Sequence, residues 1–407
     1  MKRLFYMFKK IKEKFLYKNF AGRNFAHMNL DSSYIYALNK PVWMDREYRI
    51  FASEAYMKNV IAHRSITMIA QSAASVPFKL YLTNETGKVP IEKHPILDLL
   101  NNPNPVMSGK ELMESIYAYR LINGNAYLLA IGSERGGIEE LVSLRPDRVA
   151  VIAGHNSMPS GYRYTVGSKS VDYNVDPITG YSSLLHIKNF HPLSDWYGLS
   201  SIESAAYSID QHNQAGAWNQ ALLQNGARPS GAITVKNSEG NPANLSEEQF
   251  NRLKNMVDEN FTGANNAGRP LILEGGLEWK EMSMSPKDMD FIESKHSSAR
   301  DIALAFGMPP QLLGIPGDNT YSNLVEARLA LWEQTIIPLI SNICEHLSSW
   351  FGAVYGREYM VTYDTDSISA LALRRESIWE RVQNASFMTI NEKRAVGLAP
   401  LKEGDKL

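Results

Sequence analysis

A stretch without lysine or arginine begins after Gly198 and constrains the fold more than any other part of the chain. Ser200 and Glu203 match the capping box that starts many helices, and the pattern then predicts a helix as far as Asn225. At 1.5 Å per residue this helix spans roughly 38 Å. Most of its polar residues are Gln and Asn, and its only acids are Glu203 and Asp210. The sequence therefore predicts a long helix that is almost free of charge.

A compact insert follows this helix and leads to a second one. Its pattern predicts a strand, a capped amphipathic helix and a hairpin, over 231–235, from Ser246 through Phe250, Leu253, Val257 and Phe261, and in LILEGGLEW at 271–279 around Gly275 and Gly276. Ser285 and Pro286 then provide an N-cap followed by proline at the first helical position. A second helix should return from there toward Phe306. The chain is therefore expected to run outward along one helix, form a small α/β unit and return along a second helix.

A loop of small polar residues separates the second helix from a third. The segment FGMPPQLLG closes the second helix, and Asn323 with Glu326 predicts the start of the next. One face of this third helix carries apolar residues at the helical period: Val325, Leu329, Trp332, Ile336, Ile340, Ile343 and Leu347. Pro338 should kink the helix, because proline removes one backbone donor and crowds the carbonyl four residues earlier.

The first half of the chain predicts a mixed α+β domain. A helical pattern over 53–75 leads into a strand at 76–81, and a capping box at Ser108 and Glu111 starts another helix. That helix turns at Asn123 and Gly124 into a strand over 126–131, and short strands fill 138–190. A strand at 359–363 and a helix from 369 to 385 complete the chain.

Bulk composition limits the classes of protein that remain. The 407 residues allow two or three domains, and 42 basic against 43 acidic side chains leave a net charge of -1. Nothing global therefore suggests binding to nucleic acid by charge. A single cysteine, Cys344, excludes a disulfide framework and predicts a buried thiol. With neither a membrane-spanning run nor the apolar core of a signal peptide, we expect a cytosolic chain.

The first 20 residues alternate basic and apolar residues at helical spacing. This segment fits either a surface helix that touches a membrane or an anionic partner, or a terminal helix solvated on its charged side. The residues alone favour the second interpretation slightly.

No motif predicts catalysis, a cofactor or a metal site. The chain has no Walker A, dinucleotide-binding, His-Glu-x-x-His or Gly-x-Ser-x-Gly pattern. The run from Asp364 to Asp366 starts like a calcium loop but has neither its glycine nor its glutamate, so a solvated turn is expected. His63, His212 and His296 fall inside predicted helices, where packing or polar-surface roles are commoner than metal ligation. We nominate no catalytic residue.

The order of these segments resembles the HK97-like family of bacteriophage portal proteins. The resemblance runs through HRSITMIAQSAASVPFKLY, HPILDLLNNPNP, LINGNAYLLAI, LVSLRPDRV, WYGLSSIESA, NGARPSGAITV, NAGRPLILEGGLEWKEMSMSPKDMDFIESK, IALAFGMPPQLLG and DNTYSNLVEARLALWEQTIIPLI. It covers about residues 60 to 350, with a shorter echo in NASFMTINEKRAVGLAPL. No single segment is specific, whereas the ordered series is.

The resemblance implies an α+β portal fold that assembles as a dodecameric ring at one capsid vertex, around a channel for double-stranded DNA. By position, it implies the following parts: a mixed α/β wing at 46–199, stem helices at 200–226 and 286–306, a clip at 227–285, a tunnel-loop region at 307–324, a long kinked wing helix and strand at 325–368, and a crown-like helical region at 369–407. The basic arm at 1–45 matches no part of the family core. Implied partners are the large terminase, a head-tail adaptor and the major capsid or scaffold protein. The implied location is the host cytoplasm during assembly and then the virion.

The same resemblance places two sets of site residues. The tunnel loop that meets DNA would contain Asp318, Asn319, Thr320, Tyr321, Ser322 and Asn323, and the clip surface that meets terminase or adaptors would contain Leu273, Gly275, Gly276 and Trp279. A loop without positive charge suits sliding DNA, because each neutralised phosphate adds to affinity through counterion release. A plain interhelical loop is the alternative that the residues alone favour.

Two other classes of protein remain open. A different head-tail connector or minor capsid protein would bind neighbours without a channel of DNA width, and a nucleic-acid-processing enzyme would carry a cluster of acids or histidines. The sequence does not separate an infectious phage from a prophage or a gene transfer agent.

Overall fold

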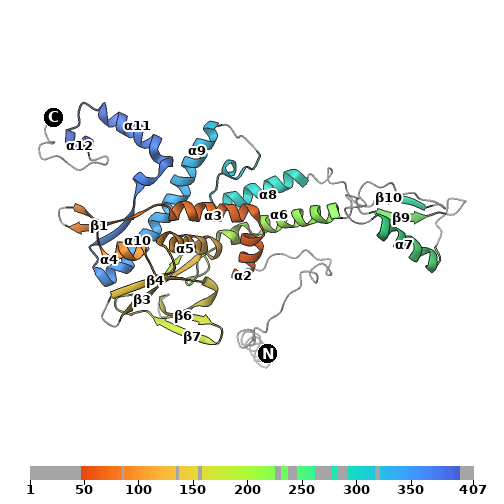
Figure 1. Cartoon of the computed structure of the whole chain (residues 1–407), viewed down its shortest axis with the longest axis horizontal. Coiled ribbons are helices and arrows are strands. Elements are labelled where there is room, and N and C mark those ends of the chain that lie inside the picture. The colour runs from red at the N-terminus through yellow and green to blue at the C-terminus, as the bar shows by residue number, and fades with distance from the viewer. Residues whose placement is uncertain are drawn as a thin grey trace, which may run out of the picture. The chain divides into compact units, whose positions relative to one another are not determined.

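The computed structural model describes residues 47–84, 87–133, 137–154, 158–224, 231–236, 245–261, 277–281, 291–316 and 321–394. The basic arm expected at 1–45 lies outside these ranges. The described chain combines helices with small antiparallel sheets (Figure 1), as the predicted α+β class requires.

Asn59 divides the first helical region into two parts. The short helix α2 (Tyr48–Ile50) continues into the π-helical segment η2 (Phe51–Met57), and α3 (Val60–Ala74) starts afresh. Asn59 has extended backbone angles, and its side chain accepts hydrogen bonds from the Ile61 and Ala62 amides. The prediction of one helix over 53–75 was therefore wrong, because an internal Asn caps a new helix at this position.

Strand β1 (Phe78–Asn84) joins segments from opposite ends of the chain. It lies between β2 (Gly87–Ile91) and β11 (Tyr359–Tyr363), antiparallel to both. The predicted strand at 359–363 is confirmed, and Val361 lies opposite Leu80 with both side chains buried. Helix α4 (Pro95–Asn101) follows β2 and packs near β1.

Helix α5 (Gly109–Asn123) leads into the central strand of a second sheet. The predicted capping box of Ser108 and Glu111 is present, and Gly124 ends the helix with φ of 77°. Strand β3 (Asn125–Ser133) pairs with β4 (Gly137–Leu144) and β8 (Leu184–Lys188). A third sheet, reached through η3 (Pro146–Arg148), contains β5 (Val149–Ala153), β6 (Pro159–Val166) and β7 (Lys169–Asn174). A small apolar core includes Tyr127, Leu144 and Tyr162.

The third long helix contains a π-helical turn just before Pro338. It comprises α9 (Tyr321–Leu331), η6 (Trp332–Ile336) and α10 (Ile337–Tyr355). Ile337 N–H bonds to the carbonyl of Trp332, five residues back. The irregularity predicted at Pro338 is thus a π turn, which accommodates the missing proline donor.

This π turn moves the buried stripe of the third helix. Ile336, Ile340, Ile343 and Leu347 are buried as predicted. Toward the N-terminus the stripe continues through Leu331, five residues before Ile336, and then Ala327. The predicted stripe through Val325 was wrong there: Val325 is exposed, because a π turn rotates the preceding helix relative to a 3.6-residue repeat.

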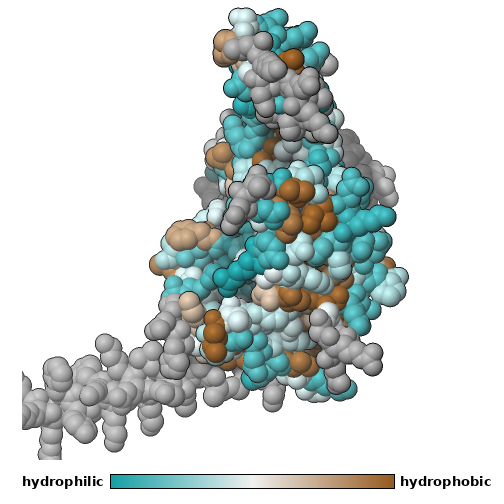
Figure 2. All heavy atoms as spheres, turned by 90° about the vertical axis from the view of Figure 1, so that its left-hand side faces the viewer, coloured by the Kyte–Doolittle hydropathy of each residue, from teal (hydrophilic) through white to brown (hydrophobic). Residues whose placement is uncertain are grey.

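The main core is shared by several helices. These are α3, α5 and α10, the base of α6 (Ser201–Gln224) and the end of α8 (Phe291–Ala305). Helices α3 and α5 lie beside each other, with α10 close by (Figure 1). Seen from the end that carries the β1–β2 hairpin and α4, the surface mixes polar residues with separate hydrophobic patches (Figure 2).

The C-terminal part is a series of short helical segments: η7 (Thr365–Ser367), η8 (Ser369–Leu371), α11 (Ala372–Gln383) and α12 (Ile390–Arg394). Helix α11 corresponds to the helix predicted over 369–385. The predicted solvated turn at 364–366 is confirmed. Lys79 Nζ lies 2.7 Å from Asp364 Oδ1 and Arg375 Nη1 lies 3.1 Å from Asp366 Oδ1, so both acids are ion-paired at the surface.

Candidate functional site

Helices α6 and α8 form an antiparallel pair, called here the helix pair, as the sequence order predicted (Figure 1). Its core is built from small and β-branched residues, namely Ile202, Ala205, Ala206 and Ile209 on α6 and Ala299, Ile302 and Ala303 on α8, all buried. Gln211 Nε2 donates to Ser294 Oγ across the pair at 3.1 Å. Small side chains on adjacent helices allow the helix axes to approach closely.

His212 ties the helix pair to the start of α3. The Asn59 amide nitrogen lies 3.2 Å from His212 Nδ1 and donates to Asn213 Oδ1 at 2.9 Å, while Asn213 Nδ2 donates to the Glu54 carbonyl. Burial lowers the pKa of His212, with Lys295 as a second cause. His212 is therefore a neutral packing residue, which agrees with the structural role expected for it.

Two glycines in contact fix the point where α6 leaves the sheet domain. A Cβ built on Gly198 would lie 2.1 Å from the carbonyl oxygen of Gly124, and one on Gly124 would lie 2.4 Å from the carbonyl oxygen of Gly198. Asn125 Oδ1 accepts from Gly198 N at 2.7 Å and from His186 Nε2 at 3.0 Å. The segments LINGNAYLLAI and WYGLSSIESA, which carried part of the resemblance, thus meet at one junction.

A second asparagine and a serine complete this junction. Asn189 accepts from Arg120 Nε at 2.7 Å, and its Nδ2 donates to the Leu199 carbonyl at 3.0 Å. Ser200 Oγ donates to the Ile122 carbonyl at 2.5 Å and accepts from Ile202 N at 3.0 Å. Ser200 therefore caps α6 and also binds the end of α5, so the start of α6 is tied to the end of α5.

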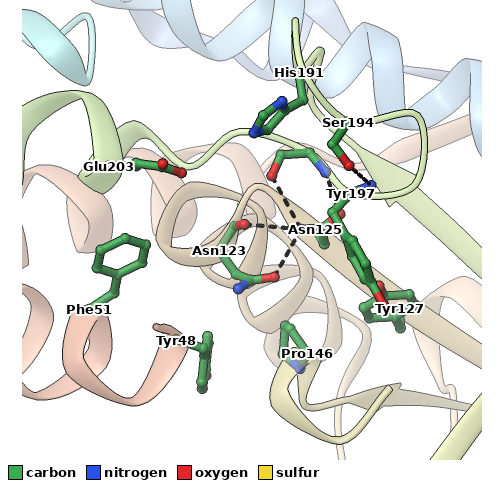
Figure 3. Close-up of a pocket in the computed structure, with 11 residues that line it drawn as sticks. Tyr48, Phe51, Asn123, Asn125, Tyr127, Pro146, His191, Ser194, Tyr197 and Glu203 are labelled. Atoms are coloured by element: carbon green, nitrogen blue, oxygen red, sulfur yellow. Dashed lines mark hydrogen bonds between the residues drawn. The ribbon is translucent and has the colours of Figure 1, made fainter. Parts of the chain in front are cut away.

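A cavity of about 320 Å³ lies beside the junction. Its lining includes Tyr48, Asn125, Tyr197 and Glu203, which surround the cavity in Figure 3. In the described part of the chain, no group of three or more His, Cys, Asp or Glu side chains could hold a metal ion. The cavity therefore offers hydrogen bonds and aromatic surface, and no cluster of metal ligands or acids.

The buried titratable groups are held in unreactive states. Burial lowers the pKa of His186 to about 3, so its ring stays neutral while it stacks on Tyr127 with centroids 4.4 Å apart. Burial raises the pKa of the Cys344 thiol to about 12. The buried thiol predicted for Cys344 is confirmed. Over the described residues, no helix is long and apolar enough to cross a membrane.

The structure fixes the chain on both sides of the polar loop. Before it, Gly307 has φ of 63° and its carbonyl accepts from Thr335 Oγ1 at 2.8 Å. Ile315 is buried, and Arg300 Nη2 donates to the Pro316 carbonyl at 2.6 Å. These contacts hold the start of the loop against α8 and against the π turn that precedes α10.

The six loop residues fall into two groups. Asp318, Asn319 and Thr320 lie outside the described residues. Tyr321, Ser322 and Asn323 form the first turn of α9, so the prediction of a helix start capped by Asn323 was wrong by about one turn. Their exposure to a DNA channel stays a prediction.

Within the part of the insert that the structure describes, there is a two-stranded sheet and one helix. Strand β9 (Gly231–Val235) pairs with β10 (Leu277–Glu281), with Trp279 opposite Ile233. Leu273, Gly275 and Gly276, with the first arm of the expected hairpin, lie outside the described residues. Helix α7 (Glu247–Phe261) starts where predicted: Ser246 Oγ accepts from Gln249 N at 3.3 Å and Gln249 Oε1 accepts from Ser246 N at 3.0 Å.

Reasoning from the sequence missed the asparagines of the junction. Asn125 and Asn189 are short polar residues at a strand start and a strand end, where turn propensity explains them equally well. The signal that could have found them is the pair of glycines at 124 and 198, since glycine is the residue that permits two backbones to meet. The sequence does not show which glycines meet, because that depends on how distant segments pack in the fold.

Comparison with known proteins agrees with this architecture. Residues 61–397 match the family described as phage portal protein. An uncharacterized protein of Rickettsia bellii (strain RML369-C) is 50% identical over 355 residues, which cover 87% of this chain and 90% of that protein. The portal protein of Enterobacteria phage HK97 is 25% identical over 360 residues, covering 84% of this chain and 79% of that protein.

A solved structure matches both the sequence and the fold. A chain in the neck of a native gene transfer agent (GTA) particle, computed with C12 symmetry, is 40% identical to this one. The match covers 90% of this chain and 98% of that chain, with a TM-score of 0.67. Because the family match spans most of the chain and includes the sheet domain, the helix pair and the third long helix, this chain belongs to the phage portal protein family.

Proposed function

We propose that this chain is the subunit of a portal ring, set at one capsid vertex, through which double-stranded DNA is packaged and ejected. The observation that carries the proposal is the 40% identical chain in a C12-symmetric particle neck, which matches this chain over 90% of its length. The ring is a structural assembly that works without catalysis of its own, powered by an ATPase on another chain.

Each part of the fold has a role in this proposal. The sheet domain at 46–199 with the helix and strand at 325–368 is the wing, the helix pair at 200–226 and 286–306 is the stem, and the insert at 227–285 is the clip. The region at 307–324 is the tunnel loop, and 369–407 forms a small crown. The tight junction at Gly124 and Gly198 supports a stem held at a fixed angle to the wing.

The polar loop is the proposed contact with DNA. It carries no lysine or arginine, so it can touch phosphates and grooves without the counterion release that holds a protein on DNA. Its base is anchored by Arg300, whose guanidinium is already engaged with the Pro316 carbonyl. Hydrogen bonding and steric contact then guide the duplex, while sliding meets little electrostatic resistance.

The clip is the proposed docking surface for the large terminase and later for a head-tail adaptor. The outer wing is the proposed docking surface for the major capsid or scaffold protein. Assembly takes place in the host cytoplasm, and the finished ring is part of the virion. The paired strands β9 and β10 give the clip a small rigid frame.

Native mass spectrometry with end-on negative-stain images is the first test. A ring of about twelve copies with a pore of about 20 Å or more, wide enough for a B-form duplex, is the expected result. A small closed oligomer without a pore, in the presence of scaffold protein, would overturn the proposal in favour of another head-tail connector or minor capsid protein.

Adding charge to the loop tests the DNA contact. Asn319→Lys should slow packaging, and the effect should weaken as salt rises, because a new phosphate contact is screened by counterions. Asn84→Lys, which places the same charge at the exposed end of β1, is the matched control. Equal packaging rates for both variants at several salt concentrations would refute a role for this loop in the channel.

Trp279→Ala tests the clip. We expect weaker terminase binding by assembled rings, because aromatic residues often dominate docking surfaces. Native mass spectrometry of the same sample reports whether the ring itself is intact. Full terminase affinity in the variant would contradict the assignment of this strand to the docking surface.

A further inference from the structure

The cavity beside the junction is built by side chains from several separate parts of the chain. Tyr48 belongs to α2, Asn123 ends α5, Tyr197 lies on the loop between β8 and α6, and Glu203 lies in the first turn of α6. In Figure 3, Glu203 and Phe51 lie on one side of the cavity and Tyr197 on the other. Its volume of about 320 Å³ is at the lower end of the range of small-ligand sites, so it suits a small organic molecule.

The lining of this cavity is acidic. Glu203 contributes a carboxylate, and among the described residues that line the cavity none is lysine or arginine. Glu203 also interacts with another group of the chain. A carboxylate has about four acceptor positions on its two oxygens, so it can accept from several donors at once. The cavity therefore favours a ligand that carries positive charge.

Two basic side chains close to the lining in sequence are held by other partners. Arg145 precedes the lining residue Pro146 and binds Asp147 through two hydrogen bonds, from Nε to Oδ1 at 3.1 Å and from Nη2 to Oδ2 at 2.8 Å. Lys188 Nζ donates to the carbonyl of Asp195. Neither side chain belongs to the lining, so the cavity keeps its acidic character.

Aromatic rings and fixed oxygen atoms form other parts of the wall. Burial raises the pKa of Tyr48 to about 12 and also raises the pKa of Tyr127, so both phenols stay neutral near neutral pH. A neutral aromatic ring attracts a cation through its quadrupole. Asn125 Nδ2 donates at 3.0 Å to both the carbonyl and the Oδ1 of Asn123. These two oxygens are held in place, and each retains a second lone pair for a ligand that donates.

Other classes of ligand match these groups less well. An anion would be repelled by Glu203. In the part of the chain that the structure describes, no group of three or more His, Cys, Asp or Glu side chains could hold a metal ion. A purely apolar molecule would cover Glu203 and Asn123 without replacing their hydrogen bonds to water, which is costly. An ammonium group, by contrast, supplies both positive charge and three donors.

We propose that this cavity binds an organic cation, an alkylammonium or guanidinium ion, with its charged head at Glu203 and its stem against Tyr48 and Tyr197. The bound cation contacts α2, the end of α5 and the first turn of α6, so it stabilises the junction from which α6 starts. The site is complete within one subunit. The inference therefore goes beyond the proposed ring and does not depend on it.

Isothermal titration calorimetry of the full-length free subunit with cadaverine tests the site. This diamine has the ammonium head and alkyl stem of a lysine side chain. We expect saturable binding and a higher melting temperature, because a ligand that binds only the native state stabilises it. The pentanediol of the same length is uncharged and should bind about tenfold more weakly or less. Equal binding of the two compounds, or no saturable binding of cadaverine, would overturn the inference.

Glu203→Gln tests where the diamine binds. Glutamine is accepted at the third position of a capping box, so α6 should still start normally, and the melting temperature without ligand checks this. Binding should weaken by about tenfold, because a charge-assisted hydrogen bond is lost. Glu293→Gln, which removes the same charge from the exposed first turn of α8, should bind like wild type. Equal losses in both variants would show attraction to overall charge alone and contradict the site.

The same titration on assembled rings identifies the source of the cation. Binding that persists in the ring assigns the site to a free cation from solution. Binding that is lost there, together with weaker assembly of Glu203→Gln than of Glu293→Gln, assigns it to a lysine or arginine side chain of an adjoining subunit. Lost binding with normal assembly of Glu203→Gln would overturn the inference. If no ring forms, the proposed function fails, while binding by the free subunit still decides this inference.

Discussion

Replacing Gly198 by alanine should be among the most damaging single-methyl changes in this protein. The new Cβ would lie 2.1 Å from the carbonyl oxygen of Gly124, against 3.4 Å for an ordinary contact, so the two backbones would have to separate by 1.3 Å. It would also lie 2.6 Å from the amide nitrogen of Asn189. Because these neighbours are backbone atoms, they cannot move aside as a flexible side chain can.

The cost follows from the contacts that such a shift breaks. Overpacking of this kind costs about 1–3 kcal/mol. Gly198 N donates to Asn125 Oδ1 at 2.7 Å and Asn189 N donates to the Gly124 carbonyl at 2.8 Å, and each buried bond lost adds about 1–3 kcal/mol. We therefore expect the free energy of unfolding to fall by about 3–9 kcal/mol, a large share of the roughly 5–15 kcal/mol that a domain has.

Urea unfolding of the free subunit, followed by circular dichroism, measures this loss. Gly216→Ala is the matched control: it adds the same methyl within α6, where a Cβ meets nothing within 4 Å. That variant should be more stable than wild type by about 0.5–1 kcal/mol, since alanine is the better helix former. A loss below about 1 kcal/mol in Gly198→Ala would refute the argument that the junction is closely packed.

Two further predictions concern buried titratable groups. The folded-state pKa of His186 is lowered to about 3 from 6.5, so its neutral form adds stability that is fully present above the unfolded pKa and is lost as pH falls from 6.5 toward 3. Between pH 7 and pH 5, the free energy of unfolding of the wild type should fall by about 2 kcal/mol more than that of His186→Gln. Urea unfolding at the two pH values measures both, and an equal fall in wild type and variant would contradict this. The Cys344 thiol, with a pKa of about 12, should react with maleimide at pH 8 about a thousandfold more slowly in the native chain than in urea, and rapid native labelling would show that the thiol is accessible.

Local pattern was enough to predict many elements of this fold. The capping box at Ser108 and Glu111, the turn at Gly124, the strand at 359–363 and the long α6 all appeared as expected. These features depend on hydrogen bonds and side-chain spacing within a few residues, which a sequence displays directly. The ordered series of segments also predicted the family correctly, because order along a chain needs no knowledge of contacts.

The predictions that failed were those in which a nonlocal or competing interaction decided the outcome. A helical pattern over 53–75 could not show that Asn59 would cap a new helix while bonding to Asn213, far along the chain. The stripe through Val325 followed a 3.6-residue repeat, and the π turn before Pro338 rotated it onto Leu331. Periodicity assumes a regular helix, so it fails where one extra residue enters a turn.

The sequence by itself determined that α6 is long and nearly uncharged, and that a small polar loop follows α8. Only the tertiary structure decided which face of α6 is buried and that Gln211 meets Ser294 on α8. It also brought Gly124 and Gly198 into contact and so set the direction in which α6 leaves the sheet domain. The physical reason is that composition and spacing are properties of one segment, whereas a face or an angle exists only once two segments have packed.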